Sequence, residues 1–83
     1  MQLGHAGAMA YPPISRPVGP SALDLPGVQC EAMTVDEILA LPEAFAATAR
    51  LARDTGFGGV QIHAAHGFLL SQFLSPLFNK RTD

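Results

Sequence analysis

The sequence predicts a parallel α/β fold, of which this chain supplies only a part. Three features lead to this prediction: a short apolar run at residues 59–63, a helical apolar stripe at residues 34–55, and an apolar strand end at residues 1–3. Strands that alternate with helices are typical of parallel sheets. One strand and a strand end cannot close a barrel, since eight strand and helix units take about 250 residues. We therefore expect residues 1–83 to form a domain that is incomplete at both ends.

The composition of the chain excludes several classes of protein. Hydrophobic residues make up 48% of the chain, charged residues 14%, and the formal net charge is -2. A disordered segment has fewer apolar residues, and a nucleic-acid-binding protein has a basic surface. No apolar run approaches the roughly 20 residues that cross a bilayer, so we expect no membrane partner. The single Cys30 has no internal disulfide partner, which fits the cytoplasm.

The first part of the chain is expected to be a strand end followed by a long loop. Residues 1–3 are the strand end, because the turn-forming segment Gly4-His5-Ala6-Gly7 comes directly after them. Prolines recur between residues 11 and 26, and each fixes φ and removes an N–H donor. We therefore expect a loop over residues 4–33. Loops longer than about 12–15 residues are usually functional or disordered.

A helix is predicted to begin after Thr34 and to end at Gly56. Thr34 and Glu37 have the spacing of a capping box, and Gly56 suits a left-handed C-terminal cap. Pro42 removes one hydrogen bond from the helix, so we expect a kink there or a restart with Pro42 in the first turn. Apolar residues at steps of three and four form one stripe: Ile38, Leu41, Phe45, Ala49 and Ala52.

A brief, mostly buried strand is predicted at residues 59–63, followed by a short helix. Val60 and Ile62 are β-branched and lie on one face of that strand, while the residues between and after them lie on the other. Residues 68–74 carry apolar side chains at helical spacing. Pro76 ends this helix, because the residue before a proline avoids the helical region.

The candidate site is the segment that follows the second strand. His63 stands at the carboxyl end of that strand, where parallel α/β sheets bind their ligands. His66 follows three residues later, so both imidazoles can converge on one small acceptor. The loops after the two strands share one face of the sheet. They therefore bring Gln2, His5, His63 and His66 toward one pocket, in which His5 is expected to order its loop.

Two other interpretations of the two histidines stay open from the residues alone. In the first, the imidazoles are structural and hydrogen-bond to neighbouring backbone. In the second, they bind a metal ion. A zinc protease motif has an acid between its two histidines, whereas this chain has Ala64 and Ala65, and His5 is the only third ligand in sight. We therefore predict no metal site.

Several longer motifs of this chain resemble those of the Old Yellow Enzyme family, in its bacterial NADH:flavin oxidoreductase and ene-reductase branches. The resemblance implies a flavin-binding (β/α)8 TIM barrel, of which residues 1–83 would be about one quarter, around the third and fourth strands. The motifs that carry it are Gln2-Leu3-Gly4-His5-Ala6-Gly7, Ile62-His63-Ala64-Ala65-His66-Gly67-Phe68-Leu69-Leu70, Gln72-Phe73-Leu74-Ser75-Pro76 and Asn79-Lys80-Arg81-Thr82-Asp83.

The resemblance also implies an activity and roles for single residues. Members of the family use FMN to transfer hydride from NADH or NADPH to activated alkenes such as enones. By resemblance, Gln2 would contact the flavin, and His63 and His66 would be the catalytic hydrogen-bond donors to the substrate oxygen. The partners would be a small-molecule alkene and the remainder of the barrel, with an oligomer possible. The other substrate-binding positions would be Ala64, Ala65 and Phe68.

The chain departs from the family pattern at two positions. Many members have a tyrosine, the usual proton donor, where this chain has Phe68, which carries no exchangeable proton. Many also have an arginine where this chain has Ala8. The alternative to an oxidoreductase fragment is a truncated, inactive piece or a small binding module that depends on a partner.

Overall fold

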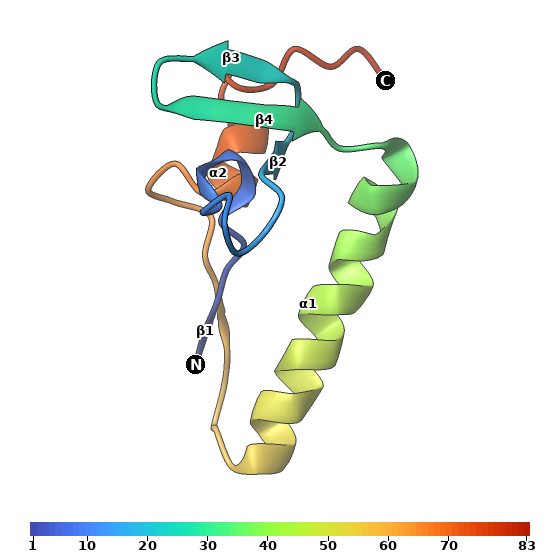
Figure 1. Ribbon diagram of the computed structural model, residues 1–83. Coiled ribbons are helices and arrows are strands. Elements are labelled where there is room, and N and C mark those ends of the chain that lie inside the picture. The colour runs from blue at the N-terminus through green and yellow to red at the C-terminus, as the bar shows by residue number, and fades with distance from the viewer.

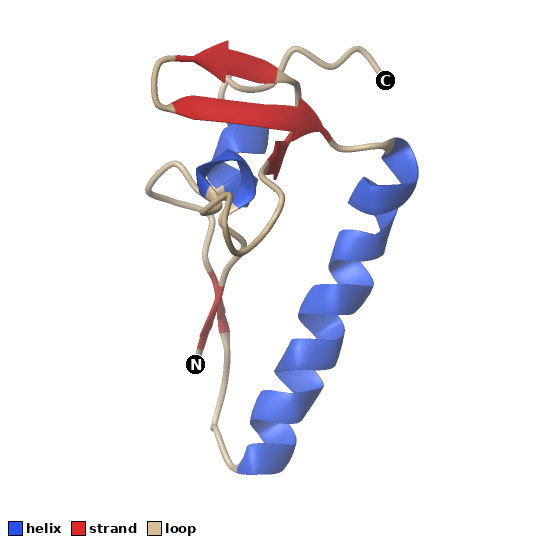
Figure 2. Cartoon of the chain, in the orientation of Figure 1, coloured by secondary structure: helices blue, strands red, loops and turns tan.

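The chain folds into two small sheets, one long helix and one short helix. The computed structural model describes all 83 residues. Figure 1 shows the long helix along one side of the molecule, and Figure 2 shows the strands grouped in two places beside it. The elements are β1 (Gln2–Leu3), the 3₁₀ turn η1 (Gly7–Met9), β2 (Val18–Gly19), β3 (Leu23–Leu25), β4 (Val28–Ala32), α1 (Val35–Thr55), β5 (Gln61–Ile62) and α2 (Leu69–Leu74).

The predicted parallel α/β unit is confirmed. Strands β1 and β5 are parallel neighbours, and α1 lies between them in the sequence. The backbone ladder continues past the assigned strands, because Gln61 N–H donates to Met1 O at 2.9 Å and His63 N–H donates to Leu3 O at 2.8 Å. In Figure 1 both strands run toward the end of the molecule that holds β2, β3 and β4. The carboxyl ends of β1 and β5 therefore face this second sheet.

The prediction of a structureless loop over residues 4–33 is wrong. These residues contain η1 and a three-stranded sheet with the order β2-β4-β3. The prolines do not prevent the sheet, because they lie outside its strands. Pro26 and Gly27 form the turn between the paired residues Leu25 and Val28, and Gly27 has a φ of 79°. Proline followed by a glycine with positive φ is the pattern of a type II turn.

Helix α1 begins and ends where the sequence predicts, but Pro42 does not divide it. The Thr34 hydroxyl accepts a hydrogen bond from Glu37 N–H at 3.1 Å, and Gly56 closes the helix with a φ of 108°. The carboxylate of Glu37 lies 3.5 Å from the Arg16 guanidinium, so it does not complete the capping box. The restart at Pro42 is wrong because one missing N–H removes a single hydrogen bond, and the Ala, Leu, Glu and Arg residues around it favour helix.

The second strand is shorter and more exposed than predicted. Strand β5 covers Gln61–Ile62, and its side chains lie at the surface: Ile62 is 47% exposed, and Val60, directly before the strand, is 40% exposed. The expectation of a mostly buried strand is therefore wrong for this chain. The strand neighbour β1 pairs with one edge of β5 and covers neither of its faces. On the apolar face, Ile62 lines an open groove with residues of α1 and α2.

The core is small and lies between the second sheet, α2 and the first turns of α1. Val18, Met33 and Leu69 form its centre, and 10 of the 83 residues are buried. Helix α2 ends before Ser75 and Pro76, as predicted. The partly buried residues around the centre are Ile38, Leu41 and Phe73. Neither helix is of a length and hydrophobicity that would let it cross a membrane.

Candidate functional site

A row of polar side chains lies along one face of the β1–β5 pair. The register places Gln2 beside Gln61, and Gln2 Nε2 donates to Gln61 Oε1 at 2.8 Å. His63 shares this face, because it follows Gln61 by two positions. A Cβ on Gly4 would lie 3.6 Å from His63 Cβ. Gly4 therefore lies beside His63, as Gln2 lies beside Gln61. We call Gln2 and Gln61 the amide pair.

His63 and His66, here called the histidine pair, lie side by side at the carboxyl end of β5. Their ring centroids are 5.1 Å apart and the rings are tilted by 44°. The ring of Phe68 lies 5.4 Å from that of His63, so three rings gather at this point. His63 is half-buried, while His66 and Phe68 are exposed. Two N–H donors at this spacing can reach one oxygen atom, since each hydrogen bond spans about 2.9 Å.

The backbone turns sharply directly after the loop that carries the histidine pair. His66 has a φ of 59° and Gly67 has a φ of 76°, so two successive residues are left-handed. A residue with a Cβ rarely adopts this conformation, and such residues cluster at functional sites. Ala64 and Ala65, between the two histidines, are exposed and add little bulk. The conformation of His66 therefore depends on contacts that hold the loop.

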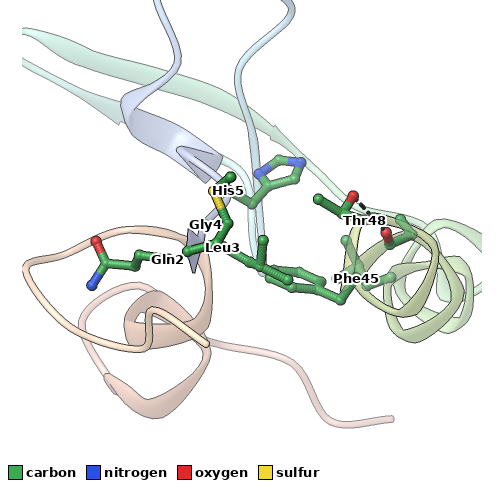
Figure 3. Close-up of a pocket in the computed structure, with 9 residues that line it drawn as sticks. Gln2, Leu3, Gly4, His5, Phe45 and Thr48 are labelled. Carbon is green, nitrogen blue, oxygen red and sulfur yellow. Dashed lines mark hydrogen bonds between the residues drawn. The ribbon is translucent and has the colours of Figure 1, made fainter. Parts of the chain in front are cut away.

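His5 orders its own loop and does not join the histidine pair in one pocket. Its Nδ1 accepts from Gly7 N–H at 3.0 Å, which confirms the expected role in the loop. His5 and Gln2 both line a cavity of about 300 Å³ between β1 and α1, and neither member of the histidine pair lines it. Figure 3 shows Gln2 extending away from Phe45 and Thr48 of this cavity. The expectation of one pocket for all four residues is therefore wrong, because the His5 ring turns to Gly7.

The histidine pair makes no hydrogen bond to the protein through its rings, whereas His5 does. The interpretation of two structural imidazoles satisfied by backbone groups is therefore not supported. The structure also places no group of three or more His, Cys, Asp or Glu side chains where they could hold a metal ion. What the pair presents is a set of ring N–H groups at the open end of the strand pair.

Sequence analysis missed one residue of this region, Gln72. Its side chain is fully buried and hydrogen-bonds to three backbone groups, those of Ala6, Ala8 and Gly67. The signal for it in the sequence is weak: helix α2 is mostly apolar, and Gln72 is its one amide, next to Ser71. A buried amide must find partners, because an unpaired one costs about 1–3 kcal/mol.

Comparisons with known proteins agree on one family. A model of the NADH:flavin oxidoreductase / NADH oxidase family matches residues 1–83. The NADPH dehydrogenase of Halalkalibacterium halodurans is 44% identical over 85 residues, which are 100% of this chain and 25% of that protein. The cinnamate reductase of Clostridium sporogenes is 48% identical over 60 residues, 71% of this chain and 9% of that protein.

Solved structures show the same relationship. Morphinone reductase superposes with a TM-score of 0.87 at 31% identity, over 99% of this chain and 28% of that one. A second structure of morphinone reductase, in complex with tetrahydroNAD, gives a TM-score of 0.87 at 32% identity. The chain thus spans about a quarter of the length of the NADPH dehydrogenase and of morphinone reductase, and has the fold of a quarter of their TIM barrel. It belongs to the NADH:flavin oxidoreductase / NADH oxidase family, the Old Yellow Enzyme family.

Proposed function

We propose that residues 1–83 supply the substrate-oxygen donors and one flavin contact of an FMN-dependent NAD(P)H oxidoreductase that reduces activated alkenes such as enones. The observation that carries this proposal is the position of the histidine pair, with ring centroids 5.1 Å apart at the carboxyl end of β5. Relatives named cinnamate reductase and morphinone reductase support a small organic substrate. The remainder of the barrel would complete the site, and Cys30 without a disulfide fits the cytoplasm.

The amide pair fits a flavin contact. Gln2 donates to Gln61 through Nε2, which leaves the Gln2 oxygen and the Gln61 amino group for other partners. An amide both donates and accepts, as the pyrimidine part of a flavin requires. Both residues are exposed on the face that carries His63. When bound, FMN would supply the hydride, taken from NADH or NADPH, to the β-carbon of the alkene.

The histidine pair would stabilise the charge that develops on the substrate. Hydride addition to an enone shifts electron density onto its oxygen atom, and ring N–H groups of His63 and His66 would donate to that atom. An imidazole carries at least one N–H in either protonation state. Such donors act like an oxyanion hole, in which the loss of one donor costs about 2.7–4 kcal/mol. Ala64 and Ala65 would leave room for the ligand beside the backbone.

Product formation also needs a proton at the α-carbon, and Phe68 cannot provide it. Its ring lies 5.4 Å from that of His63 and carries no exchangeable proton. We propose that Phe68 packs against the substrate and that water or another residue supplies the proton. Phe68 would therefore help to shape the substrate site and would not take part in proton transfer.

The experiment that tests the proposal uses the intact protein that contains residues 1–83. We expect it to bind FMN and to oxidise NAD(P)H when cyclohexenone is added. Replacing both histidines, His63→Ala with His66→Ala, should weaken the binding of para-hydroxybenzaldehyde, a phenolic probe, by roughly a hundredfold. Titration of the flavin absorbance measures that affinity. An unchanged affinity would remove the two histidines from the site, and a protein indifferent to FMN would reject the oxidoreductase.

The second candidate is an inactive piece or a partner-dependent binding module. It is favoured by exposed apolar side chains on α1 and β5, among them Leu39 at 70% and Leu51 at 66% exposure. The assays of the intact protein separate the candidates, and a flavin titration of the isolated 83-residue chain tests whether the chain binds flavin by itself. We expect no stoichiometric FMN binding by the chain alone, because most of the barrel is absent from it. Stoichiometric binding would show that the chain is a flavin-binding unit by itself.

A further inference from the structure

Gln72 is the fully buried polar side chain of this fold. It lies in α2, which is separated from β5 by six residues, and none of its surface is exposed. Gln72 Oε1 accepts from Ala8 N–H at 3.1 Å. Its Nε2 donates to Gly67 O at 2.7 Å and to Ala6 O at 3.3 Å. One amide therefore satisfies three backbone groups in two segments that are far apart in the sequence, Ala6 and Ala8 in one and Gly67 in the other.

Ala6 and Gly67 belong to the two loops at the carboxyl ends of β1 and β5, and Ala8 lies in η1, which directly follows the first loop. Ala6 directly follows His5, at the end of the first loop, and Gly67 directly follows His66, at the end of the second. A further bond joins the same region, because Leu69 N–H donates to His5 O at 2.9 Å. Gln72 thus fixes the spacing between the loop after β1 and the loop that carries the histidine pair.

The bond to Gly67 also explains how His66 keeps its left-handed conformation. His66 has a φ of 59°, which costs about 1–3 kcal/mol unless the surroundings hold it. The hydrogen bond from Gln72 to Gly67 O is the shortest of the three, at 2.7 Å, and Gly67 is the residue directly after His66. Gly7 permits the close approach, since a Cβ there would lie 2.5 Å from Gln72 Oε1.

We propose that Gln72 is a positioning residue, which fixes the two loops so that His63 and His66 point their donors at one substrate oxygen. This inference rests on the proposed function of the histidine pair. Glutamine suits the position because its amide donates to two carbonyl groups and accepts from one N–H. A glutamate carboxylate would keep the acceptor and lose both donors, and a methionine would lose all three bonds at nearly the same volume.

The test compares two near-isosteric changes in the intact protein that contains this chain. Gln72→Met should lower kcat/KM for cyclohexenone by roughly ten- to a hundredfold, since a catalytic group displaced by about 1 Å can cost a hundredfold. Its FMN content should stay at one per chain. Asn79→Leu is the matched control. The Asn79 amide also bonds backbone, donating to Phe73 O at 2.9 Å and accepting from Arg81 N–H at 3.0 Å, and it contacts neither loop.

A double-mutant cycle shows whether Gln72 acts through the histidines. Gln72→Met should weaken the binding of para-hydroxybenzaldehyde about tenfold in the wild-type background and have no effect when His63 and His66 are both alanine. An equal loss in both backgrounds, or an equal loss in Asn79→Leu, would overturn the positioning role. If Gln72→Met fails to fold, Gln72→Glu replaces it in the same cycle, with the same expected loss.

The outcomes also separate this inference from the proposed function. If the double alanine variant loses affinity for the probe and the Gln72 variants do not, the histidines bind the substrate and Gln72 does not position them. If the double alanine variant keeps its affinity, the proposed function fails, and the positioning role fails with it.

Discussion

Gly7 is a single position at which side-chain volume decides how closely two loops approach. Its φ is 62°, and a Cβ there would lie 2.5 Å from Gln72 Oε1 and 3.0 Å from Leu69 Cα. Gly27 has a similar φ of 79° but no neighbour within 4 Å of such a Cβ. A substitution at Gly27 therefore carries only the cost of the backbone conformation, whereas one at Gly7 also carries the cost of crowding.

We expect Gly7→Ala to lower the free energy of unfolding by about 1–3 kcal/mol more than Gly27→Ala, since overpacking a tight contact adds to the conformational cost. Urea denaturation of the intact protein measures both variants. Equal losses in the two variants would mean that the loops move apart without cost.

Phe68 offers a second test at the level of one residue. Its ring packs 5.4 Å from that of His63, so a tyrosine in its place would bring a hydroxyl group to the three-ring cluster. If protonation limits turnover, Phe68→Tyr should raise kcat for cyclohexenone tenfold or more, because general acids contribute about 10²–10⁴-fold. Steady-state turnover in H₂O and D₂O measures the effect. An unchanged kcat and isotope effect would place the proton source elsewhere.

Helix α1 depends on its N-terminal cap. The Thr34 hydroxyl accepts from Glu37 N–H at 3.1 Å, whereas the Thr48 hydroxyl donates back to Ala44 O at 3.0 Å within the helix. Thr34→Ala should cost about 1 kcal/mol of unfolding free energy, and Thr48→Ala should stay within about 0.5 kcal/mol of the wild type. Thermal and urea unfolding of the two variants give the comparison. If Thr34→Ala is as stable as Thr48→Ala, packing and not the Thr34 cap stabilises the N-terminus of α1.

The last residues of the chain connect the second sheet to the segment after α2. The Arg81 guanidinium donates to Pro20 O at 2.9 Å and to Met33 O at 2.6 Å, which lie on either side of the β3–β4 hairpin. It also pairs with both carboxylate oxygens of Asp83, at 2.9 and 2.6 Å. The hydrogen bond from Arg81 lowers the pKa of the Asp83 carboxyl below its ordinary value.

The direction of this pKa shift sets the pH range in which Asp83 stabilises the fold. A carboxyl with a lowered pKa in the folded state stabilises the fold above its unfolded pKa, and this contribution is lost as the pH falls through the folded pKa, below about pH 4. Wild type and Asp83→Asn should therefore differ in stability at neutral pH and converge in acid. Urea denaturation at a series of pH values tests this. A constant difference over that range would mean that Asp83 is not linked to folding.

The whole molecule has a small core for its length. Ten of 83 residues are buried, and large apolar side chains such as Ile62 and Leu77 are 47% and 76% exposed. The apolar stripe of α1 is only partly covered, since Ala52 is its one buried member. Small domains are marginal even with a full core. We therefore expect the isolated chain to unfold without a sharp cooperative transition in circular dichroism, and a sharp melt would show that it is a folding unit.

The parts of the fold that the sequence predicts well are those with local signals. Thr34 and Gly56 fix the ends of α1, and Pro76 follows the end of α2. The β3–β4 hairpin does not follow from the frequent prolines, which disfavour regular structure, and its one local signal is the Pro26-Gly27 turn between the two strands. The closeness of His63 to His66 follows from their spacing, whereas the roles of both residues stay a prediction.

Local sequence patterns are enough to predict the order of strand, helix and strand, the helix ends, and the placement of two histidines at the end of a strand, because each depends on residues close together in the chain. The folded structure is needed to show that Gln2 pairs with Gln61, that the His5 ring turns to Gly7, and that Gln72 is buried between two loops. The contacts of the glutamines join residues 59 positions apart for Gln2 and Gln61, and 66 positions apart for Gln72 and Ala6. Their partners are set by the register of β1 and β5 and by the packing of α2, which no local pattern encodes.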